Sequence, residues 1–348
     1  MPANLTPEYK RAEQAYRAAQ DERERLALLK EMLRTIPKHK GTEHLQADLK
    51  SRIKQLTDEL AGPRKGAART GPVHTVRREG AAQIALLGPP SSGKSSLHAR
   101  LTGSRAAIGP YPHTTREPLP GMLPFEDIHF QLVDLPPISA DYVDSWLVNA
   151  LQRADAALLV VDMSDPACAE QVEAIVRQLE ERRVSLIAEW PASVARPAHG
   201  AEDDEDDDDE MPDPFRIRLP TLLVANKSDR ELDPADLEAL EELIGIAFPS
   251  IAVSAETGAG LDAIGPFLFR ELGIVRVYTK APGKPPEMDR PFTIRRGETV
   301  LDVARLVHKD IASSLKYARV WGTGVFDGQQ VGPEHELHDR DVVELHMH

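Results

Sequence analysis

Short apolar runs, separated by polar segments with glycine and proline, dominate the middle of this 348-residue chain. They lie at 84–87, 128–134, 156–162, 185–190, 221–225 and 251–253. Apolar runs of this length are typical of strands buried in a parallel sheet, and residues 166–183 have the spacing of an amphipathic helix. The pattern therefore predicts an α/β domain with a mostly parallel sheet over residues 81–273.

Residues 1–61 follow a helical period instead. One apolar stripe contains Leu45, Leu49, Ile53, Leu56 and Leu60, and a shorter stripe contains Leu26, Leu29 and Leu33. Pro37 and Gly41 interrupt the pattern between the stripes, and Thr42 is placed to cap the second helix. We expect two antiparallel helices that form a hairpin, and a solvated helical extension is the alternative.

The last segment, 274–348, predicts a small α+β module. Strands are expected at 275–278, 291–294, 318–321 and 341–345, with a helix at 299–308. Strands on both sides of a single helix indicate a ubiquitin-like β-grasp fold. Residues 62–80 are rich in glycine, proline and basic side chains, so they predict a linker. Its positive charge is a modest hint of RNA or acidic partners, and solvation is the favoured interpretation.

Charge and composition narrow the functional classes. The net charge is −14, but nine of the acidic residues form one run at 202–210, inside a break in the pattern at 191–216. Adjacent carboxylates repel one another, so this segment predicts a disordered surface insertion. The rest of the chain is only mildly acidic and indicates no DNA-binding surface.

Cysteine and hydropathy add two expectations about the environment. Cys168 is the only cysteine, which excludes an intrachain disulfide and a cysteine-cluster metal site. The N-terminal segment is polar, and no apolar run approaches the length of a membrane span. We expect a cytoplasmic protein that does not associate with membranes.

Residues 88–95 form the strongest chemical motif. The sequence Gly88-Pro-Pro-Ser-Ser-Gly-Lys-Ser95 follows an apolar strand and precedes a helix, which is the setting of a phosphate-binding loop. Its glycines bring backbone N–H groups close to phosphate oxygens, Lys94 supplies a cation for the β- and γ-phosphates, and the Ser95 hydroxyl is a ligand for Mg²⁺. The expected nucleotide-binding residues of this loop are Gly88, Pro89, Ser91, Ser92, Gly93, Lys94, Ser95 and Ser96.

Two further oxygen donors are expected near the metal. Thr115, next to Thr114, lies in a polar loop punctuated by prolines, where a segment that switches with the nucleotide belongs, and its hydroxyl can complete the Mg²⁺ shell. Asp134 ends the strand 128–134, so its carboxylate can hold a Mg²⁺-bound water. The predicted metal site consists of Ser95, Thr115 and Asp134.

Asn226-Lys-Ser-Asp229 follows the strand 221–225 and predicts the base. The carboxylate of Asp229 can accept from both the ring N–H and the exocyclic amine of guanine, whereas adenine presents no such donor pair. Asn226 can bridge to the phosphate loop, and the stem of Lys227 can lie over the base. Downstream, Ser254 and Ala255 follow the strand at 251, and the Ala255 N–H is placed to meet the guanine carbonyl.

The ordered motifs resemble those of the TRAFAC GTPases. They are the phosphate loop 88–95, Thr114-Thr-Arg116, Asp134-Leu-Pro-Pro137, Asn226-Lys-Ser-Asp229 and Ser254-Ala-Glu256. Tyr111-Pro-His-Thr-Thr115 and Asp134-Leu-Pro136 are similar to the Obg-like branch. The helix that opens at Lys40-Gly-Thr-Glu-His44 resembles the N-terminal region of the developmentally regulated GTP-binding proteins. Three C-terminal segments resemble the TGS domain of that family: His308-Lys-Asp-Ile311, Lys316-Tyr-Ala-Arg-Val-Trp-Gly322 and Gln330-Val-Gly332.

The resemblance implies a GTP- and GDP-binding protein that requires Mg²⁺ and hydrolyses GTP slowly, with Lys94, Thr115 and Asp134 in the catalytic roles. It implies the ribosome, through its RNA or protein, as the partner, together with a regulatory partner protein. Some Obg-like relatives have asparagine where this chain has Ser91, so the resemblance leaves potassium dependence open.

One position departs from the family pattern D-L-P-G. Pro137 replaces the glycine whose N–H donates to the γ-phosphate in the family, and proline has no N–H to give. The next residue, Ile138, is apolar, so no glutamine orients water there. Low intrinsic turnover is therefore expected. A scaffold that binds GTP or GDP without hydrolysis is the alternative, and a P-loop kinase or ATPase is disfavoured by Asn226 to Asp229.

Overall fold

The computed structural model describes residues 6–19, 22–37, 42–61, 76–104, 117–139, 143–144, 146–192, 216–230, 239–240, 242–243 and 245–347. These residues fall into two compact units: one contains the N-terminal helices together with Arg216, and the larger one contains both β-sheets. Thr114 and Thr115, the acidic run 202–210 and most of the basic linker lie outside the described residues. The boundaries expected for the linker and the domains stay predictions.

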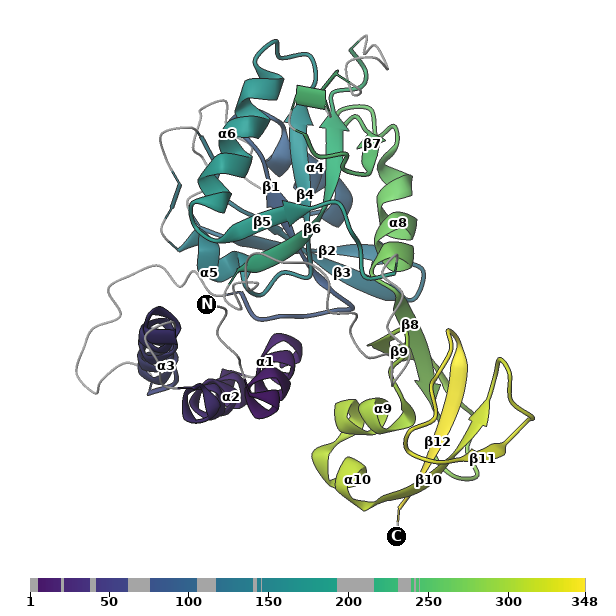
Figure 1. Ribbon diagram of the computed structural model, residues 1–348. Coiled ribbons are helices and arrows are strands. Elements are labelled where there is room, and N and C mark those ends of the chain that lie inside the picture. Colours follow the sequence, from purple (N-terminus) through teal and green to yellow (C-terminus); the bar gives the residue numbers. More distant parts are fainter. Residues whose placement is uncertain are drawn as a thin grey trace, which may run out of the picture. The chain divides into compact units, whose positions relative to one another are not determined.

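The predicted helices at the N-terminus are confirmed, and there are three in the described residues rather than two (Figure 1). They are α1 (Pro7–Ala18), α2 (Glu22–Thr35) and α3 (Glu43–Ala61). Their shared core contains Leu29, Met32 and Leu49 from α2 and α3, with Tyr9 and Ala12 from α1. The sequence analysis missed α1 because two tyrosines, Tyr9 and Tyr16, and Ala12 form its core face, so it lacks the leucine stripe that marks the other two helices.

The larger sheet confirms the predicted α/β class. Its strands are β1 (Gln83–Leu87), β2 (Leu119–Phe125), β3 (Ile128–Asp134), β4 (Ala156–Asp162), β5 (Val184–Ile187), β6 (Ile217–Asn226) and β7 (Ser250–Ala252). Among the described residues the order is β2-β3-β1-β4-β6-β5, with β7 also paired to β6. Only the β2–β3 pair is antiparallel in this described sheet.

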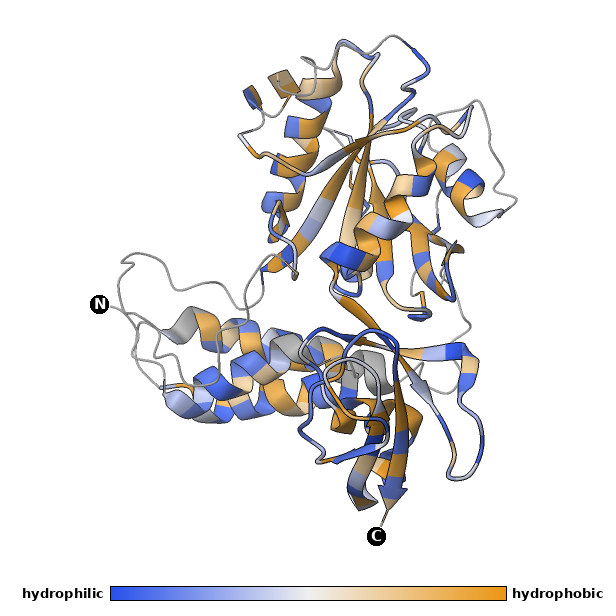
Figure 2. Cartoon of the chain, turned by 90° about the vertical axis from the view of Figure 1, so that its right-hand side faces the viewer, coloured by the Kyte–Doolittle hydropathy of each residue, from blue (hydrophilic) through white to orange (hydrophobic). Residues whose placement is uncertain are grey.

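The two faces of this sheet carry separate hydrophobic cores, because successive side chains of a strand point to opposite faces. Ile84 and Leu86 face α4 (Lys94–Thr102) and α8 (Ile264–Glu271), while Ala85 and Leu87 face α5 (Leu147–Leu151) and α6 (Cys168–Glu180). The short 3₁₀ helix η2 (Leu261–Ala263) precedes α8. Figure 2 shows the hydrophobic strands between these covering helices.

The antiparallel edge strand β2 was not expected from the sequence. Its residues, Leu-Pro-Gly-Met-Leu-Pro-Phe, include two prolines and a glycine, which argue against a central strand. An edge strand tolerates proline because one side of its backbone has no neighbour to bond. The antiparallel pairing with β3 carries the chain to Asp134 at the carboxyl end of that strand.

The C-terminal residues form a second sheet, as predicted. Its strands are β8 (Ile274–Thr279), β9 (Glu287–Arg295), β10 (Leu315–Trp321), β11 (Gln329–Val331) and β12 (Asp341–Met347), in the order β11-β10-β12-β8-β9. The helix α9 (Val300–Val307) packs Val300 and Val303 against Val277 and Val320 of this sheet. A second short helix, α10 (Lys309–Ser314), follows it, so the single helix expected from the sequence is one of two in the described residues.

The parallel strands end together and so place the site. Leu86 pairs with Asp134, Leu87 with Leu159, and Asp162 with Asn226, so β1, β3, β4 and β6 end at the same edge of the sheet, and β4 and β6 continue three residues beyond β1. In open α/β sheets this edge is where ligands bind. Among the described helices, none has the length and apolar character needed to span a bilayer.

Candidate nucleotide-binding site

The turn from β1 to α4 has a backbone that only glycine fits at two positions. Gly88 (φ +148°) and Gly93 (φ +90°) lie in the region of φ that disfavours side chains. A Cβ on Gly88 would overlap the Val160 carbonyl oxygen, and one on Gly93 would overlap the Asn226 amide nitrogen. The two glycines therefore let the loop approach β4 on one side and residues 226–229 on the other. We call residues 226–229 the base-recognition segment, after the role predicted for them.

Lys94 begins α4 and is buried beneath this loop. Its Nζ donates to the carbonyl oxygens of Gly88 (3.0 Å) and Pro89 (2.9 Å). Burial lowers the pKa of Lys94 to about 8, although the nearby Asp134 carboxylate opposes the shift. An ammonium that is already desolvated and near the loop is well suited to phosphate oxygens, which would replace the two carbonyls.

Ser95 and Asp134, two of the three predicted metal ligands, meet in the structure. The Ser95 hydroxyl donates to Asp134 Oδ2 at 2.6 Å, and Asp134 is fully buried. A hydroxyl and a carboxylate are the hard oxygen donors that Mg²⁺ prefers, so the donor set fits this ion. Thr115, the third expected ligand, lies outside the described residues.

Pro137 and Ile138 occupy the place where the family pattern has a γ-phosphate donor. The Ile138 N–H donates to the Gly88 carbonyl at 3.2 Å, and the Ile138 side chain is fully buried in the core beside Leu135 and Leu147. Because Pro137 has no N–H and the next N–H is bonded to the phosphate loop, this segment presents no backbone donor from either residue. The sequence predicts the loss of the donor at Pro137, and in the structure the N–H of Ile138 does not replace it.

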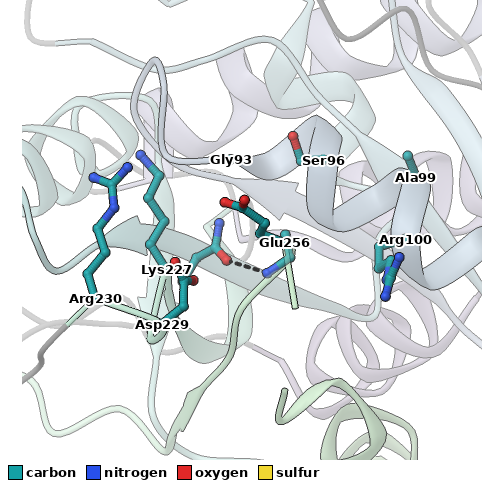
Figure 3. A pocket seen from close by; sticks show the side chains of 10 residues that line it. Gly93, Ser96, Ala99, Arg100, Lys227, Asp229, Arg230 and Glu256 are labelled. Carbon is teal, nitrogen blue, oxygen red and sulfur yellow. Dashed lines mark hydrogen bonds between the residues drawn. The ribbon is translucent and has the colours of Figure 1, made fainter. Parts of the chain in front are cut away.

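Asn226, at the end of β6, joins the base-recognition segment to the phosphate loop. Its Nδ2 donates to the Ser92 carbonyl at 2.9 Å, and its Oδ1 accepts from the Ala255 N–H at 3.0 Å (Figure 3). The sequence analysis expected the bridge to the loop. It expected the Ala255 N–H to face the guanine carbonyl, whereas in the structure Asn226 accepts this N–H.

Asp229 is the exposed carboxylate that the sequence analysis assigned to the base. The Ser254 hydroxyl donates to Asp229 Oδ1 at 2.5 Å, and Ser254 Oγ in turn accepts from the Thr257 N–H at 3.1 Å. The hydrogen bond from Ser254 lowers the pKa of Asp229, so this side chain is an anion at neutral pH. Ser254 thus orients the carboxylate of Asp229, and its expected part in nucleotide binding stays a prediction.

A cavity of roughly 520 Å³ lies between these segments. It is lined by Gly93, Ser96, Ala99, Arg100, Asn226, Lys227, Asp229, Arg230, Ala255 and Glu256 (Figure 3). Predicted residues from the phosphate loop, from 226–229 and from the segment after β7 therefore line one space. Ser91 contributes through its carbonyl, which accepts from Lys227 Nζ at 3.1 Å.

Four charged residues near the cavity were not among the predicted site residues. Arg100, Arg230 and Glu256 line it, and Asp162 pairs with Lys227. Two local signals were available: Arg230 directly follows Asp229, and Asp162 ends a buried strand beside the one that ends at Asn226. Carboxyl ends of neighbouring parallel strands converge, so a polar residue at that point was a candidate.

Two protein families match separate parts of the chain. Residues 83–190 match the family described as 50S ribosome-binding GTPase, and residues 275–347 match the TGS domain. The fold, the motif order and the cavity agree with these two assignments. One segment of the chain thus matches a GTPase family, and a separate C-terminal segment matches the TGS domain.

Relatives extend over almost the whole chain. Developmentally-regulated G-protein 2 of Arabidopsis thaliana is 30% identical over 90% of this chain and 88% of its own length. Developmentally-regulated GTP-binding protein 2 of Homo sapiens is 26% identical over 91% of this chain and 96% of its own, and an uncharacterised GTP-binding protein of Methanocaldococcus jannaschii is 28% identical over 92% of each. The chain therefore belongs to the developmentally regulated GTP-binding protein family.

Proposed function

We propose that this protein binds GTP and GDP with Mg²⁺, hydrolyses GTP slowly and acts as a switch that associates with the ribosome. The carrying observation is the arrangement of Asp229. Ser254 orients this carboxylate at the cavity, while Asn226 ties the same segment to the phosphate loop. One end of the cavity then reads guanine and the other holds phosphates.

Three side chains divide the work at the phosphates. Lys94 would exchange its two carbonyl partners for phosphate oxygens, as its burial at the loop favours. Ser95 and Asp134 would hold Mg²⁺, and Thr115 is proposed as the third ligand. When bound, this ion neutralises charge that develops on the phosphates. The protein positions and desolvates the phosphates through the loop backbone and Lys94.

Slow hydrolysis is supported by the segment after β3. Pro137 has no N–H for the γ-phosphate, and Ile138 is buried in the core, so neither residue orients an attacking water. The loss of one charge-assisted hydrogen bond costs about 1.5–3 kcal/mol. We therefore propose that the intrinsic rate is low and that the protein distinguishes GTP from GDP weakly.

The ribosome is proposed as the partner because residues 83–190 match a family that is described as ribosome-binding. The test is GTP turnover with and without purified ribosomes, together with co-sedimentation of the protein with ribosomes in GTP and in GDP. Faster phosphate release with ribosomes, and sedimentation that depends on the nucleotide, would support the proposal. Unchanged turnover and no co-sedimentation would contradict it.

A second candidate is a scaffold that binds GTP or GDP without hydrolysis and contacts its partner through the TGS domain. The bonded N–H and buried side chain of Ile138 favour it, because hydrolysis lacks a water-orienting group from this position. A single-turnover assay with radiolabelled GTP and ribosomes separates the candidates. Labelled GTP that stays intact while the protein co-sediments would identify the scaffold.

A further inference from the structure

The loop after β4 contacts the base-recognition segment from the side. Asp162 is the last residue of β4 and pairs in register with Asn226 of β6. Its Oδ2 accepts from Lys227 Nζ at 2.5 Å. The Asp162 and Lys227 side chains are 14% and 26% exposed, so this ion pair is partly shielded from water.

The same loop also contacts Arg230, the residue that follows Asp229 in the sequence. Asp162 Oδ1 accepts from the Ser164 N–H (3.1 Å) and from the Ser164 hydroxyl (2.6 Å). Ser164 Oγ in turn accepts from Arg230 at 3.2 Å. Asp162 therefore reaches residue 227 directly and residue 230 through Ser164, and the two positions bracket the carboxylate that reads the base.

Lys227 has a conformation that needs such support. Its φ of +64° lies in the left-handed region, which is unfavourable for a residue other than glycine. Its ammonium contacts both Asp162 and the Ser91 carbonyl (3.1 Å), so the two ends of the side chain are fixed. The stem between them lines the cavity.

We propose that Asp162 is a positioning residue for guanine nucleotides: it anchors the ammonium of Lys227 so that the aliphatic stem lies along the face of the bound base. The proposal rests on the proposed function, because it requires the base to occupy the cavity beside Asp229. Asp162 does not touch the nucleotide. It acts through the ammonium of Lys227.

If Asp162 had only a structural role, Asp162→Asn would lower the melting temperature, and this fall would account for any weaker binding. Partly exposed ion pairs contribute little to folding stability, so removal of the charge should leave the fold nearly unchanged. If Asp162 holds the stem over the base plane, its loss weakens purine nucleotides alike, whether or not the base carries the amine that Asp229 reads. Guanine and hypoxanthine nucleotides are therefore the two probes, since they share the ring and differ in that amine.

The experiment measures the dissociation rates of fluorescent GDP and of fluorescent inosine diphosphate (IDP), the hypoxanthine nucleotide, from the full-length protein. Asp162→Asn should raise both rates by about tenfold, a change equivalent to 1.4 kcal/mol. The melting temperature without nucleotide should stay near that of the wild type. Asp165→Asn is the matched control: this carboxylate lies in the same loop and bonds to Ala167 and Gln171, not to Lys227, so its rates should not change.

Lys227→Met provides an independent arm, because methionine keeps an unbranched stem but removes the ammonium. It should raise the two rates as Asp162→Asn does, and the double variant should add nothing further. Unchanged rates in Asp162→Asn, additive effects in the double variant, or a fall in melting temperature that accounts for the weaker binding would overturn the proposal.

The proposed function fails in a distinguishable way. If Asp229→Asn leaves the preference for GDP over IDP unchanged, the base does not lie beside that carboxylate and the proposed function is wrong. If Asp229→Asn removes this preference while Asp162→Asn changes neither rate, only the positioning role of Asp162 is wrong.

Discussion

The two ends of the proposed nucleotide site differ in the hydrogen-bonding groups that the chain supplies to each. At the base end, Ser254 donates to Asp229, while Asn226 accepts from the Ala255 N–H and donates to the Ser92 carbonyl of the phosphate loop. At the end where the γ-phosphate is expected, Pro137 lacks an N–H and the Ile138 N–H is bonded to Gly88.

This difference separates recognition of the base from detection of the third phosphate. Specific hydrogen bonds to a base reject a competitor strongly, because a mismatched base leaves buried polar groups unpaired. Detection of the γ-phosphate needs donors that are made or lost with that group. We therefore propose that the site favours tight binding of any guanine nucleotide over a large response to GTP hydrolysis.

The largest expected effect breaks the base end. Asp229→Asn removes the acceptor pair for guanine and should weaken GDP binding by about 100-fold or more, because two charge-assisted hydrogen bonds are lost. The amide can instead pair with xanthine, so xanthosine diphosphate (XDP) should bind the variant more tightly than it binds the wild type. Competition of GDP and XDP against a fluorescent nucleotide measures both. A variant that still prefers GDP would show that Asp229 does not read the base.

The next effect repairs the phosphate end. Pro137→Gly restores a backbone N–H where the family has one, and should raise the preference for GTP over GDP by roughly 10- to 100-fold, the equivalent of one charge-assisted hydrogen bond. Kd values for GTP and GDP, together with phosphate release, test it. Equally fast turnover in wild type and variant would contradict the role given to Pro137. Pro136→Gly, one position earlier, is the matched control.

A smaller effect breaks the link between the ends. Gly93→Ala would place a methyl group against the Asn226 amide and force an unfavourable φ of +90°. Loss of the bond from Asn226 to Ser92 should weaken GTP and GDP equally, by about tenfold. Gly103→Ala has a similar left-handed φ at the end of α4 but open space around it, so it controls for backbone strain. If Gly103→Ala lowered nucleotide affinity as much as Gly93→Ala does, backbone strain alone would explain the effect.

The smallest effect concerns pH and Lys94. Its pKa of about 8 lies below the ordinary value, so between about pH 8 and 10.5 the unfolded state binds more protons and stability without nucleotide rises with pH. Phosphates favour the charged ammonium, so binding takes up a proton above pH 8. The Kd for GDP should therefore rise with pH there, by at most tenfold per unit.

Calorimetry of GDP binding at pH 8.5, in two buffers with different ionisation enthalpies, measures this uptake directly. Proton uptake near zero would show that Lys94 is already charged before the phosphates arrive. The phosphate groups do not confuse the result, because their own protons are lost well below this pH.

Much of the fold and site could be predicted because the signals are local. The phosphate loop and Asn226 to Asp229 each follow an apolar strand, so a short stretch of sequence contains both the side chains and their setting. The edge strand β2 was missed because its prolines oppose strand formation, and only pairing with β3 overrides them.

The contacts between distant segments could not be predicted in the same way. Asp162 is one carboxylate after an apolar strand, and its importance emerges only when β4 lies beside β6. The Ala255 N–H was assigned to the base, but the structure pairs it with Asn226, a residue 29 positions earlier in the chain. Such pairings depend on strand order and side-chain direction, which a single sequence does not specify.

The most direct test of the central claim is displacement of a fluorescent GDP analogue from the wild-type protein by GDP, GTP, XDP and ATP. The account predicts that GDP and GTP displace it within about tenfold of each other, and that XDP and ATP require at least about 100-fold higher concentrations. Displacement by ATP or XDP at concentrations similar to GDP would contradict recognition through Asp229. A preference for GTP well beyond tenfold would contradict the weak γ-phosphate detection assigned to Pro137.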